Sequence, residues 1–138
     1  MIIGIGTDLC DIRRIEKTIE KFGERFTARV FTKAERAYCE PLSARASAYA
    51  KRWAAKEAVA KALSTSQSGH LQWRDVEVLK EPSGRPIIKL HGSAKRRLKD
   101  ILPSGTTGQI HISLTDDYPY AQAFAICEAL TDDSRDKI

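Results

Sequence analysis

In the first quarter of the chain, a short run of apolar residues is followed by apolar residues at the spacing of a helix. Residues 2–5 are apolar, which predicts a strand that ends at Gly6, and Thr7-Asp8 then supplies side-chain oxygens that cap a helix. From Ile12 to Phe22, apolar residues recur every three or four positions, as on one face of a helix. Gly23 predicts the end of this helix.

Two further helices are predicted before residue 64. Thr32 and Glu35 form a capping-box pattern, so a short helix over 34–38 follows and ends before Pro41. Residues 43–63 contain no glycine or proline and are rich in alanine, which predicts the longest helix of the chain.

The period changes to two in the second half of the chain. Alternating residues predict a hairpin over 73–91, whose turn is the proline- and glycine-containing segment E-P-S-G-R-P. A helix over 93–102 and two strands, 108–115 and 120–127, follow. Helices that precede a run of antiparallel strands favour an α+β fold. We expect one domain over 1–138, with residues 131–138 as a polar tail.

Composition narrows the class of protein. A chain that is 42% hydrophobic and 30% charged, with no apolar run long enough to cross a bilayer, is predicted to be globular and to have no membrane partner. The N-terminus lacks the pattern of a signal peptide, so we expect a cytoplasmic protein. The three cysteines are widely separated, which favours buried thiols over a disulfide framework or a zinc site. The net charge of +5 favours an anionic partner.

Candidate chemistry lies at three places in the chain. Asp8 is a helix cap or a cation ligand next to a helix N-terminus. Glu57 and Lys61 lie four residues apart on one helix face, so they form either a surface ion pair or a site for a metal and a phosphate. His111 and Ser113 share a strand face, which leaves a hydrolase with a serine nucleophile as a weaker hypothesis.

Each of these patterns is weak alone, but their order is specific. The segments G-I-G-T-D-L-C-D-I-R-R-I, R-W-A-A-K-E-A-V-A-K-A-L, S-G-R-P and H-I-S-L-T-D-D-Y-P-Y-A-Q-A together resemble the holo-acyl-carrier-protein synthases, the small phosphopantetheinyl transferases of bacteria. The resemblance covers residues 2 to about 127. One departure is Ser64, where the family often has a glycine after K-A-L.

The resemblance implies a fold and a reaction. The fold would be the phosphopantetheinyl transferase fold, with an antiparallel sheet packed against a long helix and three subunits in a trimer whose active sites lie between neighbours. The phosphopantetheine arm of coenzyme A would be transferred to a serine of apo acyl carrier protein, and adenosine 3',5'-bisphosphate would be released. The pathway would be fatty acid biosynthesis.

The resemblance also implies the roles of individual residues. Asp8 and Glu57 would bind Mg²⁺, and Lys61 would contact a phosphate of coenzyme A. Gly84, Pro86 and His111 would line the coenzyme A site. Arg14 and Arg25 would contact the acidic carrier protein. The base that takes the serine proton would be Glu57 or a metal-bound water.

A different class of function also accounts for the charge. Basic residues concentrate in residues 13–29 and 95–99, as they would in a nucleic-acid-binding module. Such a module has no need of acidic Asp8 and Glu57 in an anion-binding pocket, and no recognised nucleic-acid-binding motif is present. The sequence therefore favours the transferase, without a nucleic-acid partner.

Overall fold

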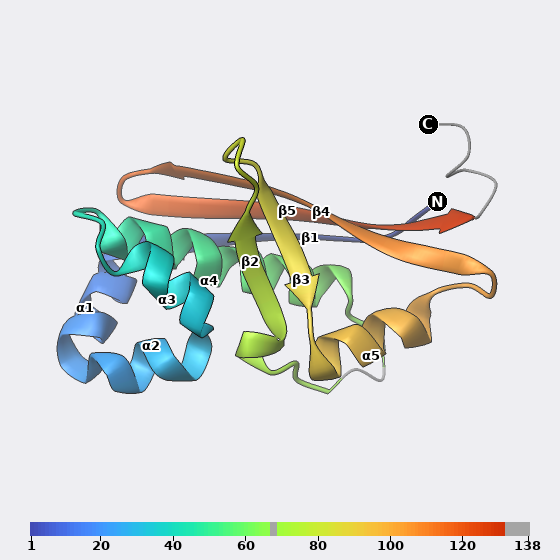
Figure 1. The fold of residues 1–138 in the computed structure, drawn as a ribbon, viewed down its shortest axis with the longest axis horizontal. Coiled ribbons are helices and arrows are strands. Elements are labelled where there is room, and N and C mark those ends of the chain that lie inside the picture. Colours follow the sequence, from blue (N-terminus) through green and yellow to red (C-terminus); the bar gives the residue numbers. More distant parts are fainter. Residues whose placement is uncertain (67–68, 132–138) are drawn as a thin grey trace.

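A three-stranded antiparallel sheet and one long helix form the centre of the molecule. The computed structural model describes residues 1–66 and 69–131. Strand order in the sheet is β1 (Ile2–Asp11), β5 (Tyr120–Thr131) and β4 (Thr106–Asp117). Figure 1 shows the helices on one side of this sheet, with α4 (Arg45–Ala62) directly against it.

Small residues allow the sheet and α4 to lie close together. Alternate residues of β5 face the helix and are buried, and four of these five are alanines: Ala121, Ala123, Ala125, Cys127 and Ala129. On β1, a Cβ added to Gly4 would lie 1.9 Å from the carbonyl oxygen of Ala62, and one added to Gly6 would lie 1.9 Å from that of Ala58. The glycines of the G-I-G segment therefore serve helix–strand packing.

The remaining elements surround this centre. The helices α1 (Ile12–Phe22), α2 (Glu24–Val30) and α3 (Lys33–Cys39) come between β1 and α4 in the chain. A short 3₁₀ helix, η1 (Trp73–Asp75), leads into the antiparallel hairpin of β2 (Val76–Lys80) and β3 (Pro86–Leu90), and α5 (Gly92–Ile101) follows. The predicted α+β fold, with an antiparallel sheet packed against a long helix, is confirmed.

Local chemistry accounts for several predicted boundaries. Thr32 and Glu35 form both hydrogen bonds of the capping box at the start of α3. Gly23, with φ of 54°, ends α1, and its amide donates to the carbonyl oxygen of Ile19. The three cysteines are buried and free, as predicted.

The prediction of the first strand and of its helix cap was wrong. β1 continues through Gly6 to Asp11, because its pairing with β5 runs without interruption from Gly4 to Asp11. Asp11, and not Thr7-Asp8, caps α1: its carboxylate accepts a hydrogen bond from the amide of Arg13 at 3.0 Å. Asp8 is therefore free of a capping role.

Two other features differ from the sequence prediction or lie beyond it. Residues 24–30 form a helix that the sequence pattern did not reveal, because α2 has only seven residues and little apolar periodicity. Phe22, expected on the buried face of α1, is 43% exposed.

Residues 132–138 of the predicted tail lie outside the described residues, and the single domain over 1–138 stays a prediction. Within the described part of the chain, no helix is long and apolar enough to cross a bilayer.

Candidate functional site

Asp8, Glu57 and Lys61 come together where β1 crosses α4. Asp8 pairs with Ala123 of β5, whose side chain is buried against α4, so Asp8 also lies on the helix side of the sheet. Lys61 Nζ donates to the carbonyl oxygen of Thr7 at 2.8 Å and lies 3.4 Å from Asp8 Oδ1. The crossing of helix and strand that the site requires is therefore present, and Glu57 does not form an isolated surface pair with Lys61.

The pKa values of both carboxyl groups are shifted in the same direction. Burial raises the pKa of Asp8, and the nearby Lys61 ammonium only partly opposes this effect. Burial also raises the pKa of Glu57, and the negative charge of Asp8 raises it further. Two partly desolvated carboxylates that repel each other are stabilised by a cation placed between them.

A pocket of about 360 Å³ opens next to these carboxylates. Its lining combines the acidic pair with a basic and an aromatic wall: Asp8, Leu9, Cys10, Asp11, Arg14, Ile15, Thr18, Phe26, Trp53 and Glu57. Asp11 is already paired with Arg13 through a two-point contact. This leaves Asp8 and Glu57 as the acidic ligands available in the pocket.

The two carboxylates fit Mg²⁺ better than a metal that needs a complete protein cage. Mg²⁺ binds oxygen and is commonly held by one or two protein carboxylates, with waters and substrate phosphates as its other ligands. Among the residues that the structure describes, no three His, Cys, Asp or Glu side chains form a metal-binding group. The raised pKa of each carboxyl group also shows that its charge lacks full compensation within the chain.

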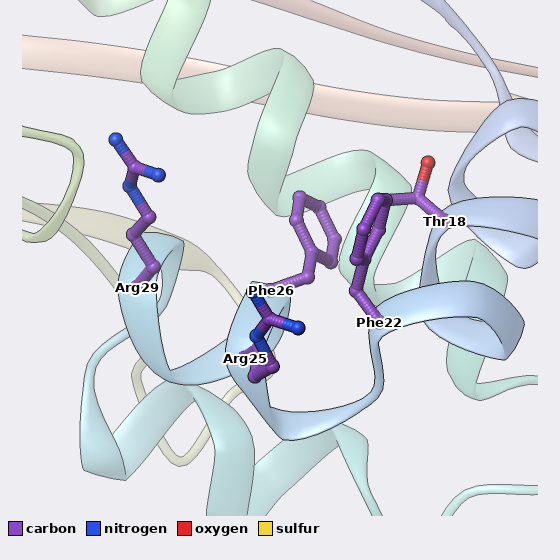
Figure 2. A pocket seen from close by; sticks show the side chains of 5 residues that line it. All are labelled: Thr18, Phe22, Arg25, Phe26 and Arg29. Atoms are coloured by element: carbon purple, nitrogen blue, oxygen red, sulfur yellow. The ribbon is translucent and has the colours of Figure 1, made fainter.

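A second pocket, of about 300 Å³, lies beside the first one and shares Thr18 and Phe26 with it. Figure 2 shows its two phenylalanines, Phe22 and Phe26, side by side, with the guanidinium groups of Arg25 and Arg29 in front and to one side. Arg25 was predicted as a contact of the carrier protein, whereas no such role was predicted for the two phenylalanines. A possible signal was the short spacing of aromatic and basic residues in F-G-E-R-F.

The other predicted site residues lie elsewhere in the single chain. His111, on β4, pairs with Ile126 and lies on the sheet face opposite to Asp8. Its Nε2 is 3.2 Å from Glu128 Oε2. Gly84, with φ of 89°, and Pro86 belong to the turn and the first strand residue of the β2–β3 hairpin. One chain therefore does not bring these residues to the Asp8–Glu57 pocket.

Glu57→Gln is expected to stabilise the metal-free protein at pH 8. Because the folded protein raises the pKa of Glu57, the stability linked to its protonation is present at low pH and is lost as the pH rises through the folded pKa. A neutral glutamine avoids this loss, so the gain in unfolding free energy should shrink as the pH is lowered towards the ordinary carboxyl range. Urea unfolding with a chelator present, at several pH values, measures it. A gain that is the same at every pH would contradict the assignment.

Comparisons with known proteins identify the family of this chain. Residues 4–123 match the model of the 4'-phosphopantetheinyl transferase superfamily. A relative named holo-[acyl-carrier-protein] synthase, from Methylobacterium radiotolerans, is 58% identical over 94% of this chain and 96% of its own length.

Solved structures agree as well. The crystal structure of holo-[acyl-carrier-protein] synthase from Neisseria meningitidis is 30% identical, with a TM-score of 0.79 over 93% of this chain and 99% of that chain. The enzyme from Helicobacter pylori, solved in complex with coenzyme A, is 27% identical, with a TM-score of 0.74 over 90% of this chain and 99% of that chain. From the family match over most of its length and its near relatives, this chain belongs to the 4'-phosphopantetheinyl transferase superfamily.

Proposed function

We propose that this chain transfers the phosphopantetheine arm of coenzyme A to a serine of apo acyl carrier protein, with Mg²⁺ bound by Asp8 and Glu57. The observation that carries the proposal is that Asp8 and Glu57 line one pocket, with Lys61 in contact with Asp8, in a chain of this superfamily. Relatives with the name holo-[acyl-carrier-protein] synthase and a structural relative with bound coenzyme A support the substrates.

The reaction is a displacement at phosphorus. The serine hydroxyl of the carrier loses its proton to a base, Glu57 or a water, and its oxygen forms a bond to the phosphorus that bears the pantetheine arm. The bond from this phosphorus to the bridging oxygen breaks, and adenosine 3',5'-bisphosphate leaves. When bound, Mg²⁺ neutralises charge on the phosphate oxygens. Lys61, whose side chain is 54% exposed, is free to turn its ammonium group from Asp8 towards a phosphate. Trp53 contributes an apolar side chain to the lining of the pocket.

The second pocket is the proposed docking site of the carrier protein. Arg14 lines the first pocket and Arg25 the second, so a carrier that contacts both would place its serine near the carboxylates. The exposed guanidinium groups suit an acidic surface, and the rings of Phe22 and Phe26 suit an apolar side chain within it. The family match makes this partner a better explanation of the basic helices than nucleic acid, which charge alone suggested.

Arg14→Glu is expected to raise the KM for carrier protein about tenfold or more, with little change in the KM for coenzyme A, because a reversed charge repels the acidic partner. Steady-state kinetics with each substrate varied in turn measures both constants. Arg96→Glu is the matched control, since Arg96 is an exposed residue of α5 that lines neither of these pockets. Equal effects of Arg14→Glu on both KM values would argue against a docking role.

We also infer a trimer in which a neighbouring chain supplies the far end of the coenzyme A site. The sheet face opposite to α4 carries exposed apolar side chains: Ile5 and Leu9 are each 63% exposed and Phe124 is 44% exposed. Large exposed apolar side chains that gather on one sheet face are typical of a surface that another subunit covers. His111 lies on this same face, so it would approach the Asp8–Glu57 pocket of a neighbour, together with Gly84 and Pro86.

Mixing two inactive variants tests this arrangement. Glu57→Gln and His111→Ala chains, unfolded and refolded together, should regain activity in about a quarter of the sites if each site combines two different chains at random. Sedimentation measures the trimer in the same sample. Activity that does not return in verified mixed trimers would contradict a site shared between two chains.

Mass spectrometry tests the proposed function as a whole. Apo acyl carrier protein incubated with this protein, coenzyme A and Mg²⁺ should gain the mass of phosphopantetheine, and a carrier in which the acceptor serine is alanine should not. A competent carrier that gains no mass would refute the proposal. The cytoplasmic location stays a prediction.

A further inference from the structure

A buried ion pair includes the residue that precedes the proposed metal ligand Glu57 in the sequence. Lys56 precedes Glu57 on α4, and its side chain is 1% exposed, while that of its partner Glu35 on α3 is 0% exposed. Lys56 Nζ donates to Glu35 Oε1 at 2.8 Å, to the carbonyl oxygen of Trp73 at 3.0 Å and to that of Val76 at 2.6 Å. All three donors of the ammonium group are thus used.

The carboxylate of Glu35 is equally well occupied. It accepts from the amide of Thr32 at 2.8 Å through Oε1 and from the amide of Val78 at 3.1 Å through Oε2. The pair therefore joins α4 to two separate parts of the chain, the start of α3 and the continuous segment of η1 and β2.

Stability alone is a weak explanation of such a pair. Removing two charges from water costs about as much as their attraction returns, and replacement of both by apolar residues is often neutral or stabilising. The best-attested use of a buried charged or polar group is to select one arrangement among several that pack equally well.

The rotation and position of α4 are only weakly fixed by its other contacts. It contacts β1 and β5 mainly through alanines, whose small side chains do not interlock strongly, and it has no side-chain hydrogen bond at its N-cap. Trp53 stacks on Trp73 with ring centroids 4.4 Å apart, but stacked rings can slide over each other. Three directional hydrogen bonds from Lys56 restrict both rotation and sliding.

Small rotations of α4 displace the carboxylate of Glu57 considerably, because this group lies far from the helix axis. A glutamate carboxylate lies about 6 Å from the helix axis, so a rotation of roughly 20° moves it by about 2 Å. Metal–ligand distances tolerate changes of only about 0.2 Å, and an error of about 1 Å in a reacting group can cost about 10²-fold in rate.

We propose that the Lys56–Glu35 pair is a positioning device that fixes the rotation of α4, so that Glu57 faces Asp8 in the geometry needed for metal binding. This inference rests on the proposed function, because it assumes that Asp8 and Glu57 are the metal ligands. Lys56 and Glu35 themselves contact neither substrate nor metal and act through Glu57.

The affinity for Mn²⁺, used as a probe for Mg²⁺ and measured by the paramagnetic resonance of the free ion, tests the proposal without reference to turnover. The double variant E35M/K56M removes both charges and should keep its fold by circular dichroism. It should bind Mn²⁺ about tenfold or more weakly, as loss of groups that orient a ligand typically does, and its KM for carrier protein should stay within about twofold of the parent value. E35Q, which keeps the size of the side chain, should weaken Mn²⁺ binding in the same direction by about threefold.

Two controls separate the possible outcomes. Val78→Ala truncates a core residue beside the pair and keeps both charges, so it should lower stability and leave Mn²⁺ affinity unchanged. Mn²⁺ affinity equal to that of the parent in folded E35Q or E35M/K56M, or an equal loss in Val78→Ala, would overturn the positioning role. If the double variant does not fold, E35Q decides. Glu57→Gln is the reference for the site: if it binds Mn²⁺ normally, the proposed metal ligands are wrong whatever the pair does.

Discussion

Glu57→Gln is expected to lower kcat/KM for phosphopantetheine transfer by about 10³-fold or more, while the protein stays folded. The substitution keeps the shape of the side chain but removes the negative charge that holds the divalent cation beside the phosphates, and charge stabilisation of this kind is commonly the largest catalytic contribution. Asp8→Asn should have an effect of the same order, because both carboxylates border one pocket. Initial rates of carrier modification at saturating Mg²⁺ measure the loss.

The two substitutions combined provide a sharper test than either one. If Asp8 and Glu57 act as one unit, the double variant should lose little more activity than the worse single variant, since a site that has lost its metal cannot lose it twice. Multiplied effects would indicate two independent roles. Glu20→Gln, at an exposed position on α1 outside both pockets, controls for the change of charge and should keep the parent rate.

Gly6→Ala is expected to destabilise the protein by about 3 kcal/mol or more, or to prevent folding. The added Cβ would lie 1.9 Å from the carbonyl oxygen of Ala58 and 2.9 Å from the backbone nitrogen of Ala62. These atoms belong to the backbone of α4, so no side-chain rotation relieves the overlap, and β1 must move away from the helix. Asp8 lies two residues after Gly6, and Glu57 directly precedes Ala58. The two carboxylates should then separate.

Urea unfolding of Gly6→Ala measures the loss of stability, and transfer assays on the folded fraction measure the loss of the site. Gly69→Ala is a suitable control, because a Cβ at Gly69 has no neighbour within 4 Å. A Gly6→Ala protein with parent stability and parent activity would show that helix and strand have room to separate without harm to the site.

The glycines of G-I-G show how much of the structure a local sequence pattern can predict. The same letters are compatible with the end of a strand and with close packing, and the predicted strand ends at Gly6. Pairing of β1 with β5 and the approach of α4 together decide in favour of packing. These contacts join residues far apart in the chain, which no local pattern describes.

Asp8 shows the same limit for a functional residue. Its position after an apolar run indicated a helix cap as readily as a metal ligand. The structure assigns the cap to Asp11 and turns Asp8 towards α4, where burial raises its pKa and Lys61, 53 residues away, lies within contact distance. A role in capping depends on the dihedral angles of two or three residues, and those angles were set by the sheet.

The sequence by itself predicted α1, α3, α4 and α5, the hairpin and the capping box, because spacings of two, three and four residues fix which neighbours share a face. The family resemblance, and not spacing, selected Asp8, Glu57 and Lys61. Tertiary structure alone decided that Asp8 and Glu57 line one pocket with Lys61 in contact with Asp8, that the second pocket shares residues with the first, and that His111 lies on the opposite face of the sheet. The physical reason is that burial and charge interaction depend on distance in space, and the packing of α4 against β1 sets those distances.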